Sequence, residues 1–509
     1  MLGEGFTWVD LCVLVVYLVF VLFFGNIFAK KDMIGKEFFK GDGTIPWYVT
    51  SVSIFATLLS PISFLSLPGN SFGGSWILWF AQLGMIIAIP IAIAFFLPVF
   101  AKLDIDTAYD YLEKRFGSKG LRILGAIAFI VYQVGRMSII IYLPSMVLAD
   151  LTNINVNLLV IVMGGIAIFY SYSGGIKAVL WSDFLQGIVV LVGVSFSLII
   201  LLNNIDGGIG AIGDAFQSGK FIAPDEEWFS FSLVKDTVFL VFVGAGFNTL
   251  TQYISSQDIV QRFTTTTNTK SLTKMLFTNG LLSMFIATVL FLIGTGLFVF
   301  YGQNNVADMF AQDQVYGHFI AYELPVGITG VILAAIFAAS QSTLSTGLNS
   351  VSTSATLDII SVLDKGKKID DKKQTAIARY ITVFVGIFAI VVAIIMTKTN
   401  IVSAYEWFNG FVGLVLGVLG GTFALGIFTK KGNAFGAYAG FIIAAIVMIT
   451  IEYILPEEYS VSIWAHSLIS IFVAFASGYI CSIIYSMNKK KESHRVQYSS
   501  ILDFKKLKP

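Results

Sequence analysis

The stretch ATLLSPIS, residues 56–63, lies in the middle of an apolar run that is long enough to cross a membrane. A proline lacks the backbone donor that a helix needs, and its ring clashes with the preceding turn. Pro61 therefore predicts an interruption near the centre of the helix over 46–68, with a kinked structural helix as the alternative. Because unwound backbone in hydrocarbon is tolerated only where it is buried in protein or lines a cavity, the interruption indicates a site inside a helix bundle.

Composition places the whole chain in the membrane class. Of the 509 residues, 56% are hydrophobic and only 12% are charged, whereas about a quarter of residues are charged in ordinary globular proteins. The two cysteines, Cys12 and Cys481, lie inside apolar runs, and the three histidines show no ligand spacing. These features argue against a disulfide framework and against a metalloenzyme. No basic residue precedes the first apolar run, which we interpret as a retained helix rather than a signal peptide.

A spanning helix needs about 20 mostly apolar residues. The sequence contains thirteen such segments: 7–28, 46–68, 74–100, 121–150, 156–173, 178–202, 233–255, 272–301, 325–362, 374–396, 403–429, 432–454 and 461–487. The segment 325–362 is too long for one span, and we expect its end to continue into the cytoplasm as an amphipathic tail.

The basic residues fix the orientation of these segments. If the N-terminus is outside, the cytoplasmic connections and the tail contain all of the 32 basic residues except Lys220, Lys235, Lys398 and Arg136. Because basic residues are held on the cytoplasmic side, this pattern predicts an all-α membrane protein with 13 transmembrane helices, the N-terminus outside and the C-terminus inside. The external connections 203–232 and 302–324 are acidic. They are either ordinary solvated loops or, as the alternative, a lid or a weak cation-attracting vestibule.

The stretch VGAGFNTLTQ, residues 243–252, weakens a second span with paired glycines and small polar groups. It lies five spans after the first interruption, so the two helices start from opposite sides of the membrane. Corresponding interrupted helices in two inverted halves point to a transporter's midplane site. We therefore predict one transporter domain over 1–509, divided into an extra N-terminal helix (7–28), a first five-helix repeat (46–202), an inverted second repeat (233–429), two C-terminal helices (432–487) and a cytoplasmic tail (488–509).

Two of the charged residues within predicted spans, Arg136 and Asp183, are candidates for a function. Arg136 is at the middle of 121–150, where a charge costs at least ~2.5–3.5 kcal/mol on insertion scales. Its guanidinium can bind a carboxylate through two parallel hydrogen bonds. The alternative is an internal salt bridge, for example to Asp183, but we favour a ligand carboxylate because no other acid is predicted at that depth. Asp183 lies in the first turns of its span and is either an oxygen ligand for a hard cation or a helix cap.

A run of small polar residues occupies the span 325–362. In AASQSTLSTGLNS, residues 338–350, one helical face carries Ser342, Ser345, Thr346 and Asn349. Such residues commonly allow close helix packing, or they bond their own backbone. Neutral hydroxyl and carbonyl oxygens are also suitable ligands for a weakly held Na⁺, since hard cations take oxygen ligands.

Three motifs carry a resemblance to a known family. They are GGIKAVLWSDFLQ (174–186), AASQSTLSTGLNS (338–350) and TAYDYLEKRF (107–116). With these residues the chain resembles the sodium:solute symporter family over nearly its whole length, and it is most similar to the family's bacterial sialic acid transporters. The resemblance implies a LeuT-like core of two inverted five-helix repeats, in agreement with the predicted topology.

The resemblance also implies roles for individual positions. The common sodium site would use the carbonyls of Ala56, Leu59 and Ala339 with the hydroxyls of Ser342 and Thr343. A second sodium site would use Asp183, Ser342, Ser345 and Thr346. Arg136 would bind the substrate carboxylate, and Thr57, Ser60, Ser63 and Gln82 would lie around the glycan hydroxyls and amide. Gln341 replaces a methionine that is common in the family, so the resemblance does not extend to local packing or selectivity at this position.

The expected function is Na⁺-coupled symport of a small carboxylated sugar, sialic acid (N-acetylneuraminate), by alternating access with two Na⁺ per substrate. We expect a monomer in the bacterial inner membrane that uses Na⁺ and no nucleic acid, and no enzymatic activity. One alternative is a symporter for a neutral sugar, polyol or amino acid, in which Arg136 serves only structure. The other is a membrane sensor that binds solute without moving it, although the sequence contains no signalling domain.

Overall fold

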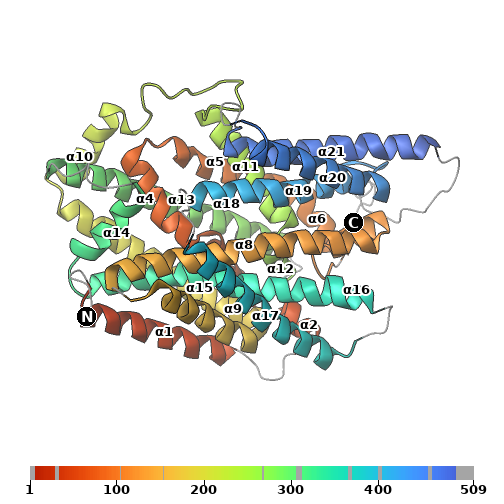
Figure 1. Cartoon of the computed structure of the whole chain (residues 1–509), viewed down its shortest axis with the longest axis horizontal. Coiled ribbons are helices and arrows are strands. Elements are labelled where there is room, and N and C mark those ends of the chain that lie inside the picture. Colours follow the sequence, from red (N-terminus) through yellow and green to blue (C-terminus); the bar gives the residue numbers. More distant parts are fainter. Residues whose placement is uncertain are drawn as a thin grey trace.

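The computed structural model describes residues 6–28, 34–103, 105–152, 154–265, 269–304, 312–364, 369–398, 404–456 and 461–488, and all regular structure within these ranges is helical. The all-α prediction is therefore confirmed for the described part of the chain. The long helices run side by side, with α1 beginning at one end of the molecule and α21 ending at the opposite end (Figure 1). Nearly all of the predicted tail, 488–509, lies outside the described residues.

The α-helices have the following bounds: α1 Trp8–Phe28, α2 Lys36–Lys40, α3 Trp47–Leu58, α4 Pro61–Gly73, α5 Phe80–Ile91, α6 Leu97–Leu103, α7 Asp110–Phe116, α8 Lys119–Thr152, α9 Val156–Asn203, α10 Gly208–Ala215, α11 Val238–Ser255, α12 Gln257–Phe263, α13 Thr269–Gln303, α14 Gln312–Tyr322, α15 Ile328–Ser354, α16 Ser361–Leu363, α17 Asp371–Met396, α18 Ala404–Val412, α19 Val418–Phe428, α20 Ala434–Tyr453 and α21 Ile463–Asn488. Short 3₁₀ or π turns join several of them into longer helices, for example Ala92–Phe96 between α5 and α6.

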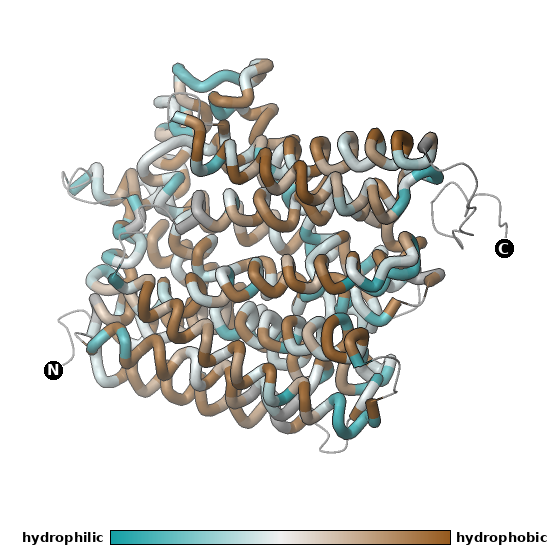
Figure 2. Tube along the Cα trace, turned by 45° about the vertical axis from the view of Figure 1, so that its right-hand side comes forward, coloured by the Kyte–Doolittle hydropathy of each residue, from teal (hydrophilic) through white to brown (hydrophobic). Residues whose placement is uncertain are grey.

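Many of these helices are suited to a membrane. Ten helices in the described ranges are long and apolar enough to span, the pair α3–α4 forms one bent span, and Trp8–Phe24 and Val156–Phe169 are shorter apolar helices. Hydrophilic segments gather at the two ends of the molecule, whereas apolar residues follow the helices between them (Figure 2). The chain is thus a multi-pass membrane protein, and the thirteen predicted segments coincide with these helices. The exact count of thirteen stays a prediction, because two of the helices are short.

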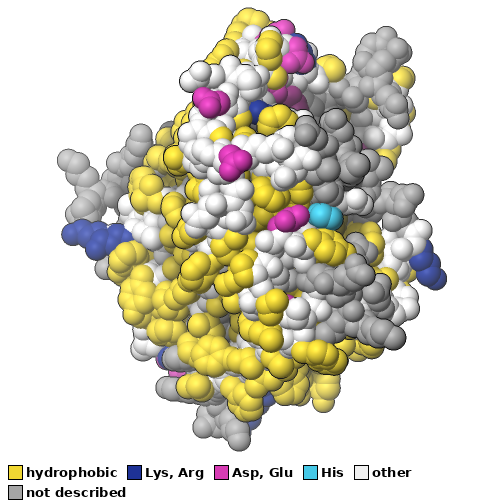
Figure 3. All heavy atoms as spheres, turned by 90° about the vertical axis from the view of Figure 1, so that its left-hand side faces the viewer, with side chains coloured by type: hydrophobic (Ala, Val, Ile, Leu, Met, Phe, Trp, Pro, Cys, Tyr) yellow, Lys and Arg dark blue, Asp and Glu magenta, His cyan; other side chains and the backbone are white. Residues whose placement is uncertain are grey.

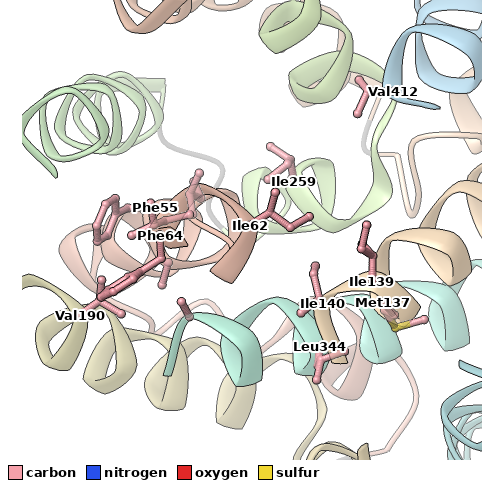
Figure 4. Packing of buried hydrophobic residues seen from close by; sticks show 14 of the residues in the cluster. Phe55, Ile62, Phe64, Met137, Ile139, Ile140, Val190, Ile259, Leu344 and Val412 are labelled. Carbon is pink, nitrogen blue, oxygen red and sulfur yellow. The ribbon is translucent and has the colours of Figure 1, made fainter. Parts of the chain in front are cut away.

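The first interruption is confirmed. α3 ends at Leu58, α4 begins at Pro61, and the two helices meet at 61°. Ser60 caps α4 by accepting a hydrogen bond from the Ser63 N–H at 3.4 Å. Pro61 occupies the first helical position, where its missing donor costs nothing. The break is therefore also a helix start, and apolar side chains of α3, α4, α8 and α15 surround it, among them Phe55, Ile62, Ile140 and Leu344 (Figure 4).

The second interruption is real, but its predicted position is wrong. α11 runs through 243–252 without a break and ends at Ser255. Ser256 then adopts an extended conformation (φ −89°, ψ 116°), and α12 begins at Gln257. The glycines that suggested a break serve packing instead, because small residues let helices approach closely. A Cβ on Gly244 would lie 2.1 Å from the Trp464 carbonyl oxygen.

Gly84 makes a matching close contact from α5 and provides a stability prediction. A Cβ at this position would lie 2.0 Å from the Phe242 carbonyl oxygen of α11. Backbone cannot shift cheaply, so Gly84→Ala should destabilise the protein by roughly 1–3 kcal/mol and lower its melting temperature in detergent. Gly165→Ala is the matched control, since nothing lies within 4 Å of the position that its new methyl group would occupy. Equal melting temperatures for the two variants would contradict the close α5–α11 packing.

Two predicted segments are refined by the structure. The segment 325–362 does continue past α15, through the turn Ala355–Ile360 into α16. Its end is not a free tail, because Asp358 is buried and its Oδ1 lies 2.7 Å from the Arg122 Nε. The spans predicted over 156–173 and 178–202 join into α9, which bends at Gly175 (φ 55°, ψ −169°).

The acidic connection after α9 packs onto the bundle. Lys220 Nζ donates hydrogen bonds to the carbonyls of Phe72 and Gly74 at 2.6 and 3.0 Å. The Ser75 hydroxyl donates to the Glu226 carboxylate at 2.6 Å. This segment therefore covers the end of α4, which favours the lid alternative over a freely solvated loop. Seen from this end, the surface carries scattered acidic side chains among apolar and neutral atoms (Figure 3).

Candidate functional site: two cation positions and a buried arginine

The first candidate cation site lies where α3 ends against α15. The Ser342 hydroxyl is 2.9 Å from the Ala56 carbonyl oxygen and 3.1 Å from that of Ala339. The Thr343 hydroxyl is 3.0 Å from the Ala339 oxygen. Leu59, the fifth predicted ligand, ends α3 with ψ 100°, which turns its carbonyl out of the helical direction. These uncharged oxygens fit a weakly held hard cation.

The second candidate cation site is built around Asp183. Its carboxylate is fully buried and lies 3.2 Å from the Ser345 hydroxyl and 3.1 Å from the Thr346 hydroxyl. The Ser345 hydroxyl also bonds the Ser342 carbonyl at 3.0 Å. Asp183 is well inside α9, so the structure does not support the helix-cap alternative. Sequence reasoning missed Ser53, whose hydroxyl donates to Asp183 Oδ2 at 2.7 Å.

Arg136 is buried at the centre of the bundle, with 1% of its surface exposed. Its Nη1 lies 2.8 Å from Asp258 Oδ2, and its Nη2 lies 2.7 Å from the Thr57 carbonyl oxygen. The assumption that no other acid reaches this depth is therefore wrong. Asp258 was missed because it follows a predicted span and resembles a residue of a polar connection. The Phe408 ring lies over the guanidinium at 5.7 Å.

Arg262, like Asp258, is not where the sequence predicts it. The predicted orientation places Arg262 in a cytoplasmic connection, but the residue lies on α12 with 0% of its surface exposed. Its Nη2 lies 2.8 Å from Asp183 Oδ2, and its Nε lies 3.1 Å from the Ser53 hydroxyl. The guanidinium therefore enters the cluster of oxygens that was predicted to hold the second sodium ion.

A cavity of about 100 Å³ lies next to the break on the side of α5 and α11. Its lining includes Ser63, Gln82, Asn248, Gln252, Phe408 and Asn409. Two of the four predicted glycan contacts, Ser63 and Gln82, thus face it. Thr57 turns its hydroxyl to Arg262, at 2.9 Å, and Ser60 caps α4, so their proposed contacts with a substrate stay predictions.

Three amide side chains in this cavity were not predicted as substrate contacts. Asn248 Nδ2 donates to Asn409 Oδ1 at 3.2 Å, and Gln252 Nε2 donates to Asn248 Oδ1 at 3.0 Å. The available signal was their position: amides in an apolar span need partners, so they gather in cavities or at helix contacts. Together with Gln82 they give the cavity several donors and acceptors for a hydroxylated ligand.

Comparison with known proteins agrees with this arrangement. A model of the sodium:solute symporter family matches residues 38–444. The chain belongs to the sodium:solute symporter family. The members of this family are transporters, not enzymes, and sodium is the coupling ion.

Several family members are similar over most of their length. The chain is 34% identical over 453 residues to the sodium/sialic acid symporter SiaT of Proteus mirabilis, covering 88% of this chain and 90% of that protein. It is 32% identical over 449 residues to the sodium/sialic acid symporter NanT of Aliivibrio fischeri, covering 88% of each. A solved structure of a Na⁺-coupled sialic acid symporter, described as a substrate-bound outward-open state with a novel Na⁺ site, matches with a TM-score of 0.85 and 30% identity, covering 94% of this chain and 98% of the other.

The geometry of this symporter predicts the effect of removing the first cation site. Ser342→Ala combined with Thr343→Ala deletes both hydroxyl ligands but preserves the two carbonyl ligands on α3. We expect the half-saturating Na⁺ concentration for uptake to rise at least tenfold, which corresponds to about 1.4 kcal/mol of lost binding free energy. Ser350→Ala is a control on the same helix, because its hydroxyl bonds only the preceding turn, at Gly347. An unchanged Na⁺ dependence in the double variant would exclude this site.

Proposed function

We propose that this symporter imports N-acetylneuraminate together with two Na⁺. The main support for a carboxylated substrate is Arg136, whose guanidinium is buried beside the broken helix. Such a group can bind a carboxylate with paired hydrogen bonds. The hydroxyl-binding groups Ser63, Gln82 and Asn248 line the neighbouring cavity. The similarity to the sialic acid symporters of Proteus mirabilis and Aliivibrio fischeri supports the same substrate.

Transport would follow from two inverted repeats, 46–202 and 233–429, that rock around this site. The interrupted helices α3–α4 and α11–α12 hold equivalent places near the starts of the two repeats. A Na⁺ bound by Ala56, Leu59, Ala339, Ser342 and Thr343 would link the end of α3 to α15. Such a link favours the conformations in which these groups converge, which is a population shift driven by differential affinity. The repeats and the site residues together define the proposed transport domain.

The second sodium ion would decide how strongly the substrate is concentrated. A tenfold Na⁺ gradient supplies about 1.4 kcal/mol per ion, and ~100 mV supplies about 2.3 kcal/mol per charge. One Na⁺ with one carboxylate moves no net charge and supports about tenfold accumulation. Two Na⁺ supply about 5 kcal/mol, which supports accumulation of several thousandfold. Asp183, Ser342, Ser345 and Thr346 are the proposed ligands of this second ion.

The proposed setting is the bacterial inner membrane, with 13 spans, the N-terminus outside, the C-terminus in the cytoplasm and a monomer as the working unit. The predicted distribution of basic residues supports this orientation. In this orientation the amide-lined cavity opens on the external side of the break, because α5 and α11 both begin outside. The acidic segment that docks through Lys220 and Glu226 would then be extracellular.

A symporter for a neutral sugar, polyol or amino acid is the second candidate. One observation favours it: Arg136 already has an internal carboxylate partner, Asp258, at 2.8 Å. In that case the arginine would serve structure, and the amides Asn248, Gln252 and Asn409 would provide the contacts with the solute. The two candidates differ in whether a carboxylate on the substrate is required.

Uptake into proteoliposomes tests the proposal. An inward Na⁺ gradient should drive uptake of labelled N-acetylneuraminate, and an equal K⁺ gradient should not. The sugar alcohol or amide that lacks the carboxylate should not compete, whereas competition by it would favour the neutral-solute candidate. A sensor that binds without transport would show no exchange of internal for external label in a counterflow assay, and that result would contradict symport.

A further inference from the structure

α12 places one acid and one base, four residues apart, in the two positions that the proposed cargo would occupy. Asp258 and Arg262 are 0% exposed, and they lie one helical turn apart on the same face. Arg262 Nη1 also donates a hydrogen bond to the Asp258 carbonyl oxygen. The role of α12 rests on the proposed function, because it concerns which groups occupy the proposed Na⁺ and carboxylate sites when the transporter is empty.

The terminal nitrogen Nη2 of Arg262 is surrounded by oxygen atoms, as a bound metal cation would be. Its Nη2 lies close to three oxygens: Asp183 Oδ2 at 2.8 Å, Thr57 Oγ1 at 2.9 Å and Thr346 Oγ1 at 2.5 Å. A terminal guanidinium nitrogen has only two N–H groups, so three close oxygens exceed its number of donors. Two of these oxygens belong to the residues proposed to hold the second Na⁺. The nitrogen therefore occupies a position that suits a metal cation.

The carboxylate of Asp258 matches the proposed substrate in the same way. One oxygen, Oδ2, bonds Arg136 Nη1 at 2.8 Å, as a substrate carboxylate would. The other, Oδ1, accepts hydrogen bonds from the Ser256 hydroxyl and from the Ile259 N–H at 3.0 Å. The two donors lie at the break between α11 and α12 and on α12 itself. They therefore fix the orientation of the Asp258 carboxylate relative to α12 while it faces Arg136.

The four buried charges balance one another. Arg136, Asp183, Asp258 and Arg262 are each at most 1% exposed and form two ion pairs. Removing one partner from a buried pair leaves an uncompensated charge and is strongly destabilising. An empty carrier without α12 in place would contain two such uncompensated charges, at Arg136 and Asp183. α12 therefore neutralises the binding sites when no cargo does.

Space for a displaced α12 exists on its other side. A cavity of about 500 Å³, on the cytoplasmic side in the proposed orientation, is lined by Val260 and Phe263 of α12 and by Lys36 and Lys40 of α2. The extended residue Ser256 joins the helix to the preceding span and can act as a hinge. Ile259 of α12 and Ile62 of α4 belong to the same apolar core and are both labelled in Figure 4, so a displaced α12 would withdraw Ile259 from this core.

We propose that Arg262 and Asp258 are tethered substitutes for the cargo: in the unloaded transporter the Arg262 guanidinium occupies the second cation site and the Asp258 carboxylate occupies the carboxylate site, and Na⁺ and substrate displace both. Loading of either ligand then competes with the docking of α12. The substitutes keep both sites electrically neutral while the empty carrier returns, so return does not require bound cargo.

Titrations of purified protein test the cation half of this inference. Melting temperatures are measured in choline chloride with added Na⁺, for the wild type and for Arg262→Ala purified in Na⁺. Without the competing guanidinium, the half-saturating Na⁺ concentration should fall at least tenfold. Millimolar methylguanidinium should stabilise Arg262→Ala in the absence of Na⁺ and shift its Na⁺ titration upward, and it should do neither in the wild type. A Na⁺ titration within twofold of the wild type, with no effect of methylguanidinium, would overturn the inference.

A second variant, Asp258→Asn, tests whether the Asp258 carboxylate occupies the carboxylate site of the substrate. It tests the inference even if Arg262→Ala does not fold. Asp258→Asn keeps the shape of the side chain and removes the competing charge, so the half-saturating N-acetylneuraminate concentration at saturating Na⁺ should fall about tenfold. Arg115→Gln is the control, because Arg115 is a buried arginine that bonds the Gly426 and Thr429 carbonyls at the end of α19. A substrate titration unchanged or weakened in Asp258→Asn would contradict the inference. If the wild type responds to neither Na⁺ nor N-acetylneuraminate, the proposed function itself fails.

Discussion

Uptake of N-acetylneuraminate by the variant Arg136→Gln/Asp258→Asn will fall at least about thirtyfold while the protein remains folded. Both charges of the buried pair are removed together, so no uncompensated charge is left behind, and such paired replacements are often neutral for stability. The substrate carboxylate, however, loses its guanidinium partner. Truncating one member of a buried, hydrogen-bonded charge pair costs about 2–5 kcal/mol of binding, which is roughly thirtyfold to several thousandfold.

The measurement is Na⁺-driven uptake in proteoliposomes, with the melting temperature as the check on folding. Arg136→Lys is the matched variant, since it keeps the positive charge and loses the planar fork that binds a carboxylate with two bonds. We expect its uptake to lie between that of the wild type and that of the double variant. Uptake at the wild-type rate by a folded Arg136→Gln/Asp258→Asn protein would mean that the arginine serves structure and that the substrate needs no carboxylate.

Asp183→Asn/Arg262→Gln will uncouple the second sodium ion from transport. The double change removes the ion pair between α9 and α12 without leaving either charge unpaired. The Na⁺ dependence of uptake should change from sigmoidal, with a Hill coefficient near 2, to hyperbolic. With one Na⁺ per substrate, the accumulation ratio at a tenfold Na⁺ gradient and ~100 mV should fall from several thousandfold to about tenfold.

A second buried ion pair supplies the control for this experiment. Asp358 is also fully buried and pairs with Arg122 at 2.7 Å, but it lies at the end of the bundle that faces the cytoplasm in the proposed orientation. Asp358→Asn should lower the melting temperature and leave the Hill coefficient and the accumulation ratio unchanged. If Asp183→Asn/Arg262→Gln still accumulates substrate several thousandfold, the second ion does not bind at Asp183.

The features that sequence reasoning found are those with a local physical cause. Pro61 cannot continue a helix, so the first break was visible at the residue where it occurs. Oxygen-bearing side chains at helical spacing in an apolar span, such as Ser342 and Ser345, have few functions other than packing or ligation. The structure brings both of them, with Thr346, to the two candidate cation sites.

The second break had no such local cause. The sequence around Ser256 contains neither proline nor glycine, whereas Gly244 and Gly246 resemble helix breakers and in fact allow α11 to pack against α21 and α5. This close approach depends on which helices are neighbours, and one sequence does not contain that information. The helix break was therefore expected about ten residues too early.

The same limit concealed the charged pair on α12. Asp258 and Arg262 follow a span and have the acid–base spacing of a solvated helix face. Their apolar neighbours Ile259, Val260 and Phe263 were the available signal that the helix is buried all around. Their partners, Arg136 and Asp183, are 122 and 79 residues away in the sequence, so only the folded bundle shows the two ion pairs.

The charge moved per substrate tests the central claim, that two sodium ions and one carboxylate share the site around the broken helix. Currents and uptake of labelled N-acetylneuraminate are recorded from the same membranes at a fixed inside-negative potential, with labelled Na⁺ in a parallel experiment. We expect one net positive charge and two Na⁺ to enter with each N-acetylneuraminate. Saturating uptake without current, with one Na⁺ per substrate, would contradict that claim.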